Sequence, residues 1–83
     1  GGVYGYVEDS ESAPLENVYL SLENGSESYS TFSDEKGYYY IIGVPPGIYT
    51  LSIEKEGYSS LVMENVVVAA GVKTNRDILL TKN

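Results

Sequence analysis

The chain has 83 residues, with 12 acidic residues against 5 basic ones and a net charge of −7 at pH 7. This length suits one domain with a small core. The lack of a basic surface excludes nucleic acid as a partner and argues against docking on an anionic membrane. Cysteine and histidine are absent, which excludes disulfides, thiolate sites and the usual general base and metal ligand, so we expect no enzyme activity, cofactor or metal.

The first part of the chain predicts three strands. Val3–Val7 alternates small apolar residues with tyrosines, and a period of two is typical of a strand with distinct faces. Val18–Leu22 repeats the alternation, and the Asn24-Gly25 pair after it predicts a type I′ hairpin turn, which needs positive φ at both central residues. The polar stretch Ser28–Ser33 is expected to return antiparallel as an edge or solvated strand.

The middle of the chain predicts two more strands, over Tyr38–Ile42 and Tyr49–Glu54. Between them, the Pro-Gly pair that closes Val44–Gly47 predicts a type II turn, in which proline sets the first φ and glycine supplies a positive one. Glycine is also expected to serve the turns that flank these two strands. The residues assigned to backbone turns are Asn24, Gly25, Gly37, Pro45, Pro46, Gly47 and Gly57.

The last part predicts strands over Val66–Val68 and Arg76–Leu80. A helix over Tyr58–Ala70 stays open because that segment lacks glycine and proline, but three consecutive valines favour a strand. The predicted fold class is all-β, a seven-stranded antiparallel β-sandwich that forms a single module over residues 1–83. The expected core consists of Val3, Val7, Val18, Leu20, Leu22, Tyr39, Ile41, Tyr49, Leu51, Ile53, Val66, Val68, Ile78 and Leu80.

An ordered set of motifs runs through nearly the whole chain. It comprises Val3-x-Gly5-x-Val7-x-Asp9, Pro14-Leu15-x-Asn17-Val18-x-Leu20, Ser33-Asp34-Glu35-Lys36-Gly37-Tyr38-Tyr39, Gly43-Val44-Pro45-Pro46-Gly47-Ile48-Tyr49, Gly57-Tyr58, Val66-x-Val68-x-Ala70-Gly71 and Asp77-Ile78-x-Leu80. This set resembles the carboxypeptidase regulatory-like domains. The resemblance implies a transthyretin-like sandwich and a non-catalytic module, of the kind that follows some metallocarboxypeptidase domains or recurs in secreted and surface-anchored bacterial proteins. Residues 37–68 are also similar to the X modules beside dockerins in cellulosome scaffolds.

Departures from related families matter too. Transthyretin-like enzymes that hydrolyse ureide rings and intradiol dioxygenases both use histidines, and this chain has none. Collagen-adhesin B-type repeats, which are similar in outline, form a cross-link from a lysine of the first strand. Val3–Asp9 holds no lysine, so we expect no such bond even though Glu54 and Asn75 would suit it.

Tyrosine is the outlier of the composition, with 9 residues of 83. If the alternation holds, five of them point away from the core: Tyr4, Tyr6, Tyr19, Tyr38 and Tyr40. Tyrosine offers a flat apolar ring and one hydroxyl, which suits an interface with a neighbouring domain or stacking on sugar rings. The alternative is that these residues only cover the sheet through cross-strand pairs.

Acidic residues gather in two predicted loops, Glu8, Asp9 and Glu11 in one and Asp34 and Glu35 in the other. Their spacing does not match a calcium loop, and side-chain hydrogen bonds within turns explain them better. Asn24-Gly25-Ser26 matches the glycosylation pattern, which the hairpin requirement already explains.

The sequence therefore predicts a non-catalytic structural or accessory module of a larger secreted or cell-surface protein, and the resemblance implies a bacterial origin. Its expected partner is a neighbouring domain of the same polypeptide, which it would space and stabilise through the tyrosines. The alternative is a carbohydrate-binding module that uses the same tyrosines on a polysaccharide. The longest uncharged stretch, Tyr38–Ile53, contains glycines and prolines, so no membrane insertion is expected.

Overall fold

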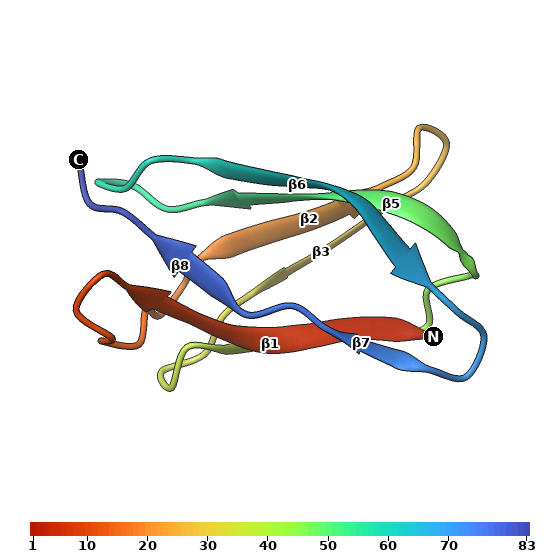
Figure 1. Cartoon of the computed structure of the whole chain (residues 1–83), viewed down its shortest axis with the longest axis horizontal. Coiled ribbons are helices and arrows are strands. Elements are labelled where there is room, and N and C mark those ends of the chain that lie inside the picture. Colours follow the sequence, from red (N-terminus) through yellow and green to blue (C-terminus); the bar gives the residue numbers. More distant parts are fainter.

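The structure, a computed structural model of residues 1–83, is a β-sandwich of two layers (Figure 1). Its Cα extents are 34 × 22 × 16 Å. The fold class predicted from the sequence is confirmed, and the number of strands is eight instead of seven. The strands are β1 (Gly2–Asp9), β2 (Tyr19–Glu23), β3 (Ser28–Phe32), β4 (Tyr38–Ile41), β5 (Gly47–Glu54), β6 (Leu61–Val68), β7 (Lys73–Asn75) and β8 (Ile78–Leu80).

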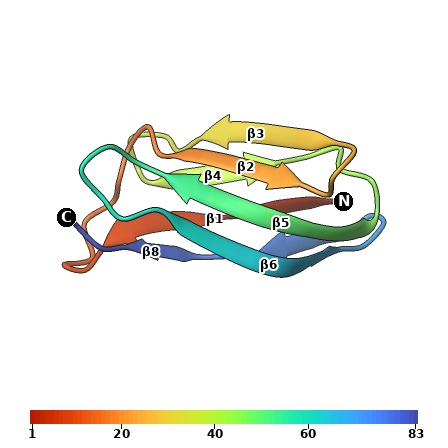
Figure 2. The same ribbon diagram turned by 90° about the horizontal axis from the view of Figure 1, so that it is seen from above.

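One sheet has the order β3-β2-β5-β6, with all neighbours antiparallel, and its strands follow one another across Figure 2. The other sheet is built on β1, which pairs with β4 on one side and with both β7 and β8 on the other. β1 is antiparallel to β4 but parallel to β7 and β8. The prediction of a wholly antiparallel sandwich is therefore wrong at this edge, because the direction of a strand pair depends on how the chain crosses between the sheets.

The C-terminal strand predicted over Arg76–Leu80 begins only at Ile78, and the sequence did not predict the short strand β7 that precedes it. Arg76 and Asp77 lie between β7 and β8, and the hydrogen bonds there differ from a regular ladder. The Arg76 amide donates to the Tyr4 carbonyl at 2.8 Å, whereas the Tyr6 amide donates to the side-chain Oδ1 of Asp77 at 3.1 Å. An aspartate side chain thus replaces a backbone acceptor between the unpredicted strand β7 and the shorter β8.

Strand β6 is longer than predicted, and the helix alternative over Tyr58–Ala70 is wrong. β6 pairs with β5 from Leu61 onward, and the register slips between Tyr49 and Leu51. Across that slip Tyr49 faces Val66 while Leu51 faces Met63, so β6 carries one extra residue, and Asn65 adopts a φ of 60°. This β-bulge interrupts the apolar alternation, which is why the sequence revealed only the last residues of the strand.

The core confirms the prediction from alternation. All fourteen residues expected inside are buried, and Leu15 and Val44 join them to make a cluster of 16. Leu15 and Val44 lie in loops, where no period of two marks the inward positions. Residues of the loops therefore add to the apolar core that the strands form.

The hairpin between β2 and β3 does not contain the predicted type I′ turn. Glu23 pairs with Ser28, so the loop spans residues 24–27, and only Gly25 has a positive φ, at 97°. Asn24 acts through its side chain instead, because its Oδ1 accepts the amides of Ser26 at 3.3 Å and Glu27 at 3.0 Å. Asn24 and Gly25 do serve the turn, but as a side-chain cap and one left-handed residue.

The predicted type II turn at Pro46-Gly47 is also wrong. Gly47 opens β5 opposite Val68, and the positive φ in this loop, 72°, belongs to Gly43. The loop through Pro45 and Pro46 is held by Tyr49, whose hydroxyl donates to the Pro45 carbonyl at 2.7 Å. In the Pro-Pro-Gly-x-Tyr motif, the tyrosine side chain therefore folds back and bonds to the loop that precedes its own strand.

The remaining predicted turn glycines are confirmed. Gly37 and Gly57 have φ values of 78° and 87°, in the left-handed region where glycine is favoured. A Cβ at Gly37 would also meet the Val7 carbonyl oxygen at 2.6 Å. Gly37 therefore allows the turn to pack closely against β1, in addition to serving the turn itself.

Tyr39 gives the sandwich a predicted pH dependence. It is buried over Gly5 on the inner face of β4, and its hydroxyl donates to the Arg76 carbonyl. Burial first, and the negative charge of Asp77 second, raise the pKa of this hydroxyl above its ordinary value of 10.0. A raised pKa means that the neutral hydroxyl stabilises the fold fully below pH 10, and that this stabilisation decreases as the pH rises above 10.

We expect Tyr39→Phe to lower the free energy of unfolding by about 1 kcal/mol near neutral pH, since one buried hydrogen bond is lost. Above pH 10 the wild-type protein should lose up to about 1.4 kcal/mol per pH unit through this one group, and the phenylalanine variant should not. Urea denaturation of both proteins between pH 7 and 11 measures the difference, which should shrink above pH 10. Curves that stay parallel over that range would contradict the burial effect.

Candidate functional site

Four tyrosines form two cross-strand pairs on the outer face of the β1–β4 pair. The antiparallel register sets Tyr4 opposite Tyr40 and Tyr6 opposite Tyr38. Since side chains alternate along each strand, these two pairs point outward together. We call Tyr4, Tyr6, Tyr38 and Tyr40 the tyrosine face.

Three rings of the tyrosine face, those of Tyr6, Tyr38 and Tyr40, lie in contact. The ring centroids of Tyr6 and Tyr38 are 5.2 Å apart, and those of Tyr38 and Tyr40 are 5.8 Å apart. Both pairs are tilted, an arrangement that aromatic rings favour. Tyr6 and Tyr40 remain 49% and 54% exposed, so the face presents wide ring surface to solvent.

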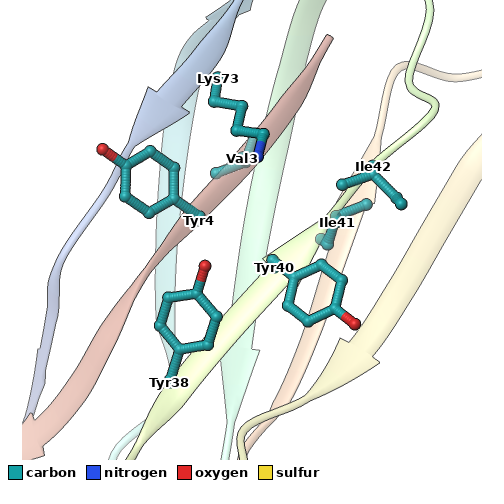
Figure 3. A pocket seen from close by; sticks show the side chains of 7 residues that line it. All are labelled: Val3, Tyr4, Tyr38, Tyr40, Ile41, Ile42 and Lys73. Carbon is teal, nitrogen blue, oxygen red and sulfur yellow. The ribbon is translucent and has the colours of Figure 1, made fainter.

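A shallow hollow of about 290 Å³ opens at one end of the tyrosine face. Figure 3 shows Tyr4, Tyr38 and Tyr40 around it, with Lys73 on the β7 side and Ile42 beyond β4. Its full lining is Val3, Tyr4, Tyr38, Tyr40, Ile41, Ile42 and Lys73. Lys73 is the single charged residue of this lining. The hollow can therefore receive a flat apolar group beside hydroxyl donors and acceptors.

Tyr19 does not belong to this site. It lies on β2, in the opposite sheet, and its ring packs on that of Phe32 with centroids 5.3 Å apart. Of the five tyrosines predicted to point outward, the structure thus brings four together and leaves Tyr19 on the other side of the sandwich. All five avoid the core, with Tyr4 and Tyr38 half-buried among their neighbours.

Sequence reasoning missed two residues beside the tyrosine face. Ile42 follows the alternation of Tyr38 and Tyr40 and is 63% exposed, so the period of two already marked its side. Lys73 had no sequence signal, because it reaches the site only through the parallel pairing of Gly2 with Lys73.

The acidic loops bind their own backbone. Asp9 Oδ1 accepts the amides of Glu11 at 2.8 Å and Ala13 at 2.9 Å. Asp34 Oδ1 likewise accepts the amides of Lys36 at 2.9 Å and Tyr38 at 3.0 Å. No three histidine, cysteine or acidic side chains come together in a way that could hold a metal ion. These aspartates therefore act as the turn residues that the sequence suggested.

The fold is shared with solved structures of varied function. A chain of a type II cohesin–X-dockerin complex from Acetivibrio cellulolyticus is similar at 28% identity and a TM-score of 0.73, over 95% of this chain and 56% of that one. The Bacillus anthracis TIE protein matches with a TM-score of 0.84 and 16% identity, over 99% of this chain and 16% of that one. The present chain thus spans little more than half of the first of these and a small part of the second.

A third similar structure is an enzyme, the 5-hydroxyisourate hydrolase of Klebsiella pneumoniae. It matches with a TM-score of 0.78 and 17% identity, over 100% of this chain and 92% of that one. At that identity the likeness extends to the fold alone.

The structure holds no helix with the length and apolar composition that crossing a bilayer requires.

No curated protein matches the chain in sequence. One protein family matches residues 2–81, which is nearly the whole chain and includes every strand of both sheets. The chain belongs to the carboxypeptidase regulatory-like domain family.

Proposed function

We propose that this chain is a non-catalytic structural module of a larger secreted or cell-surface protein, which spaces neighbouring domains and packs against one of them through the tyrosine face. The observation that carries the proposal is the tyrosine face itself. Four aromatic rings lie together at the surface of a protein of only 83 residues, with an apolar hollow beside them. Tyrosine is enriched among residues that dominate the binding energy of interfaces.

The positions of the termini support the spacer role. The N-terminus and the C-terminus lie at opposite ends of the longest axis in both views (Figures 1 and 2). A domain joined at each end would therefore be separated from the other by roughly the 34 Å length of the sandwich. The resemblance to modules of secreted and surface-anchored bacterial proteins supports an extracellular location.

The composition of the hollow supports a non-catalytic role. Its lining offers hydroxyls and one ammonium group, but no carboxylate pair, thiol or imidazole. General acid–base and nucleophilic catalysis need such groups within hydrogen-bond reach of each other. Binding is the chemistry that this surface suits.

A second candidate function is carbohydrate binding. The tilted rings of Tyr38 and Tyr40 beside the hollow favour it, since a sugar ring can stack on an aromatic face while its hydroxyls bond to tyrosine. Both functions would use the same face. A titration with each kind of partner therefore distinguishes them.

The test is an amide-resolved NMR titration of the ¹⁵N-labelled module. The probes are the adjacent domain of its parent polypeptide and, separately, soluble cello-, xylo- and host-type oligosaccharides. We expect shifts on β1 and β4 with the adjacent domain and none with the glycans. Shifts on those strands with a glycan would replace the structural role by carbohydrate binding, and silence toward both probes would refute the interface.

A pair of variants sharpens this prediction. Tyr40→Ala should weaken docking of the adjacent domain about tenfold, because exposed tyrosines at an interface centre often contribute more than 1 kcal/mol. Phe32→Ala is the matched control, since Phe32 is similarly exposed, at 59%, on the opposite sheet. Isothermal titration calorimetry measures both affinities. Equal losses for the two variants would show that the tyrosine face is not the docking surface.

A further inference from the structure

The first and last strands of the chain lie side by side and run in the same direction. β1 pairs in parallel with β7 from Gly2 opposite Lys73 to Tyr4 opposite Asn75. It pairs again in parallel with β8, from Val7 opposite Ile78 to Asp9 opposite Leu80. The first strand is therefore paired near both of its ends with the last two strands, and Figure 1 shows these red and blue strands side by side.

This pairing determines how tension between the termini would act. Because the strands are parallel and the termini lie at opposite ends of the long axis, pulling on both ends draws β1 and β8 past each other along their own direction. The hydrogen bonds between them run across the pulling direction, so many must break together. An antiparallel terminal pair pulled from adjacent ends would instead lose its bonds one at a time.

Hydrogen bonds to β1 continue across the interruption between β7 and β8. The Tyr6 amide donates to Asp77 Oδ1 at 3.1 Å, and the Arg76 amide donates to the Tyr4 carbonyl at 2.8 Å. The Gly2 amide adds a bond to the Val72 carbonyl at 3.1 Å. Backbone contacts thus continue from one end of β1 to the other, with the Asp77 side chain bridging the gap.

We propose that the parallel junction of β1 with β7 and β8 is a force-bearing clamp, which lets the module carry tension between the domains it joins. The proposal deepens the spacer role and rests on it for its biological use. The tyrosine face takes no part in it, because those rings point outward from β1 and β4 and bond nothing on β7 or β8.

The test is single-molecule force spectroscopy on the whole chain, with the direction of pulling as the variable. One sample carries handles at both termini, and the other carries them at the N-terminus and at a cysteine introduced by Val72→Cys. Val72 is 51% exposed in the turn before β7, and the chain has no other cysteine. The second geometry opens the β1–β7 pair from one end, bond by bond.

We expect the force for end-to-end unfolding to exceed the force in the second geometry by at least about twofold at the same loading rate, because forced unfolding reports the barrier along the pulled direction. Equal forces, or a lower force end to end, would overturn the clamp. The Val72→Cys protein is also pulled end to end, so that any loss from the substitution itself is measured.

A variant pair locates the resistance. Asp77→Ala removes the bridge to Tyr6 and should lower the end-to-end force, whereas Asn24→Ala removes comparable side-chain bonds in the β2–β3 loop and should leave that force unchanged. Equal effects of the two variants on the force would overturn the assignment to the β1 junction. Asp77 bonds to the backbone amide of Tyr6 and not to its ring, so neither variant removes a ring of the tyrosine face. Failure here therefore leaves the NMR test of docking unaffected, and failure of docking leaves the clamp intact.

Discussion

Replacing Gly5 by alanine is expected to lower the free energy of unfolding by about 3 kcal/mol or more, which corresponds to roughly 12 °C or more in Tm for a domain of this size. Gly5 lies in the middle of β1, where the chain between β7 and β8 passes closest. A Cβ at Gly5 would lie 2.7 Å from the carbonyl carbon of Arg76 and would overlap its oxygen. The obstacle is backbone, so no side-chain rotation relieves the clash.

Thermal and urea denaturation of Gly5→Ala measure this loss, and Gly43→Ala is the matched control. Gly43 has a φ of 72° and nothing within 4 Å of an added Cβ, so its substitution should cost only the backbone strain of about 1 kcal/mol. A Gly5 variant that is no less stable than the Gly43 variant would show that β1 and the Arg76 segment are not held as closely as described.

Ser33→Ala should lower the free energy of unfolding by about 2–4 kcal/mol, since two buried backbone groups lose their only partner. The Ser33 hydroxyl donates to the Leu15 carbonyl at 2.7 Å and accepts the Val18 amide at 2.9 Å. Its side chain is buried, so water cannot replace either bond. This one hydroxyl fastens the loop before β2 to the end of β3.

The matched control for Ser33→Ala is Ser30→Ala, on the exposed side of β3 in the same sheet. That substitution should change stability by less than about 0.5 kcal/mol. Both values come from urea denaturation monitored by tyrosine fluorescence or circular dichroism. If Ser33→Ala proves as mild as its control, the hydroxyl does not serve both backbone groups.

The alternation of apolar residues predicted correctly which side chains enter the core. A strand places successive side chains on opposite faces, so Val3 and Val7 or Leu51 and Ile53 mark an inward face without knowledge of the partner strand. The same alternation could not show which sheet a strand joins. Tyr19 therefore looked equivalent to Tyr4 and Tyr40 in the sequence, yet it lies on the other side of the sandwich.

Turn geometry was the weaker part of the sequence prediction. Residue type restricts φ but does not choose among the conformations that remain, and loop length and the register of the flanking strands make that choice. Asn24-Gly25 therefore lies in a four-residue loop closed by the asparagine side chain, and Gly43 rather than Gly47 takes the left-handed conformation.

The sequence by itself determined the all-β class, the inward faces of the strands and the outward direction of five tyrosines, because all three follow from local alternation. Only the tertiary structure decided which tyrosines share a surface, that Lys73 borders the hollow, and that the first strand lies parallel to the last two. These features join residues about seventy positions apart, such as Tyr4 and Asn75. Contacts at that separation depend on how the chain crosses between the two sheets, and no local pattern records that path.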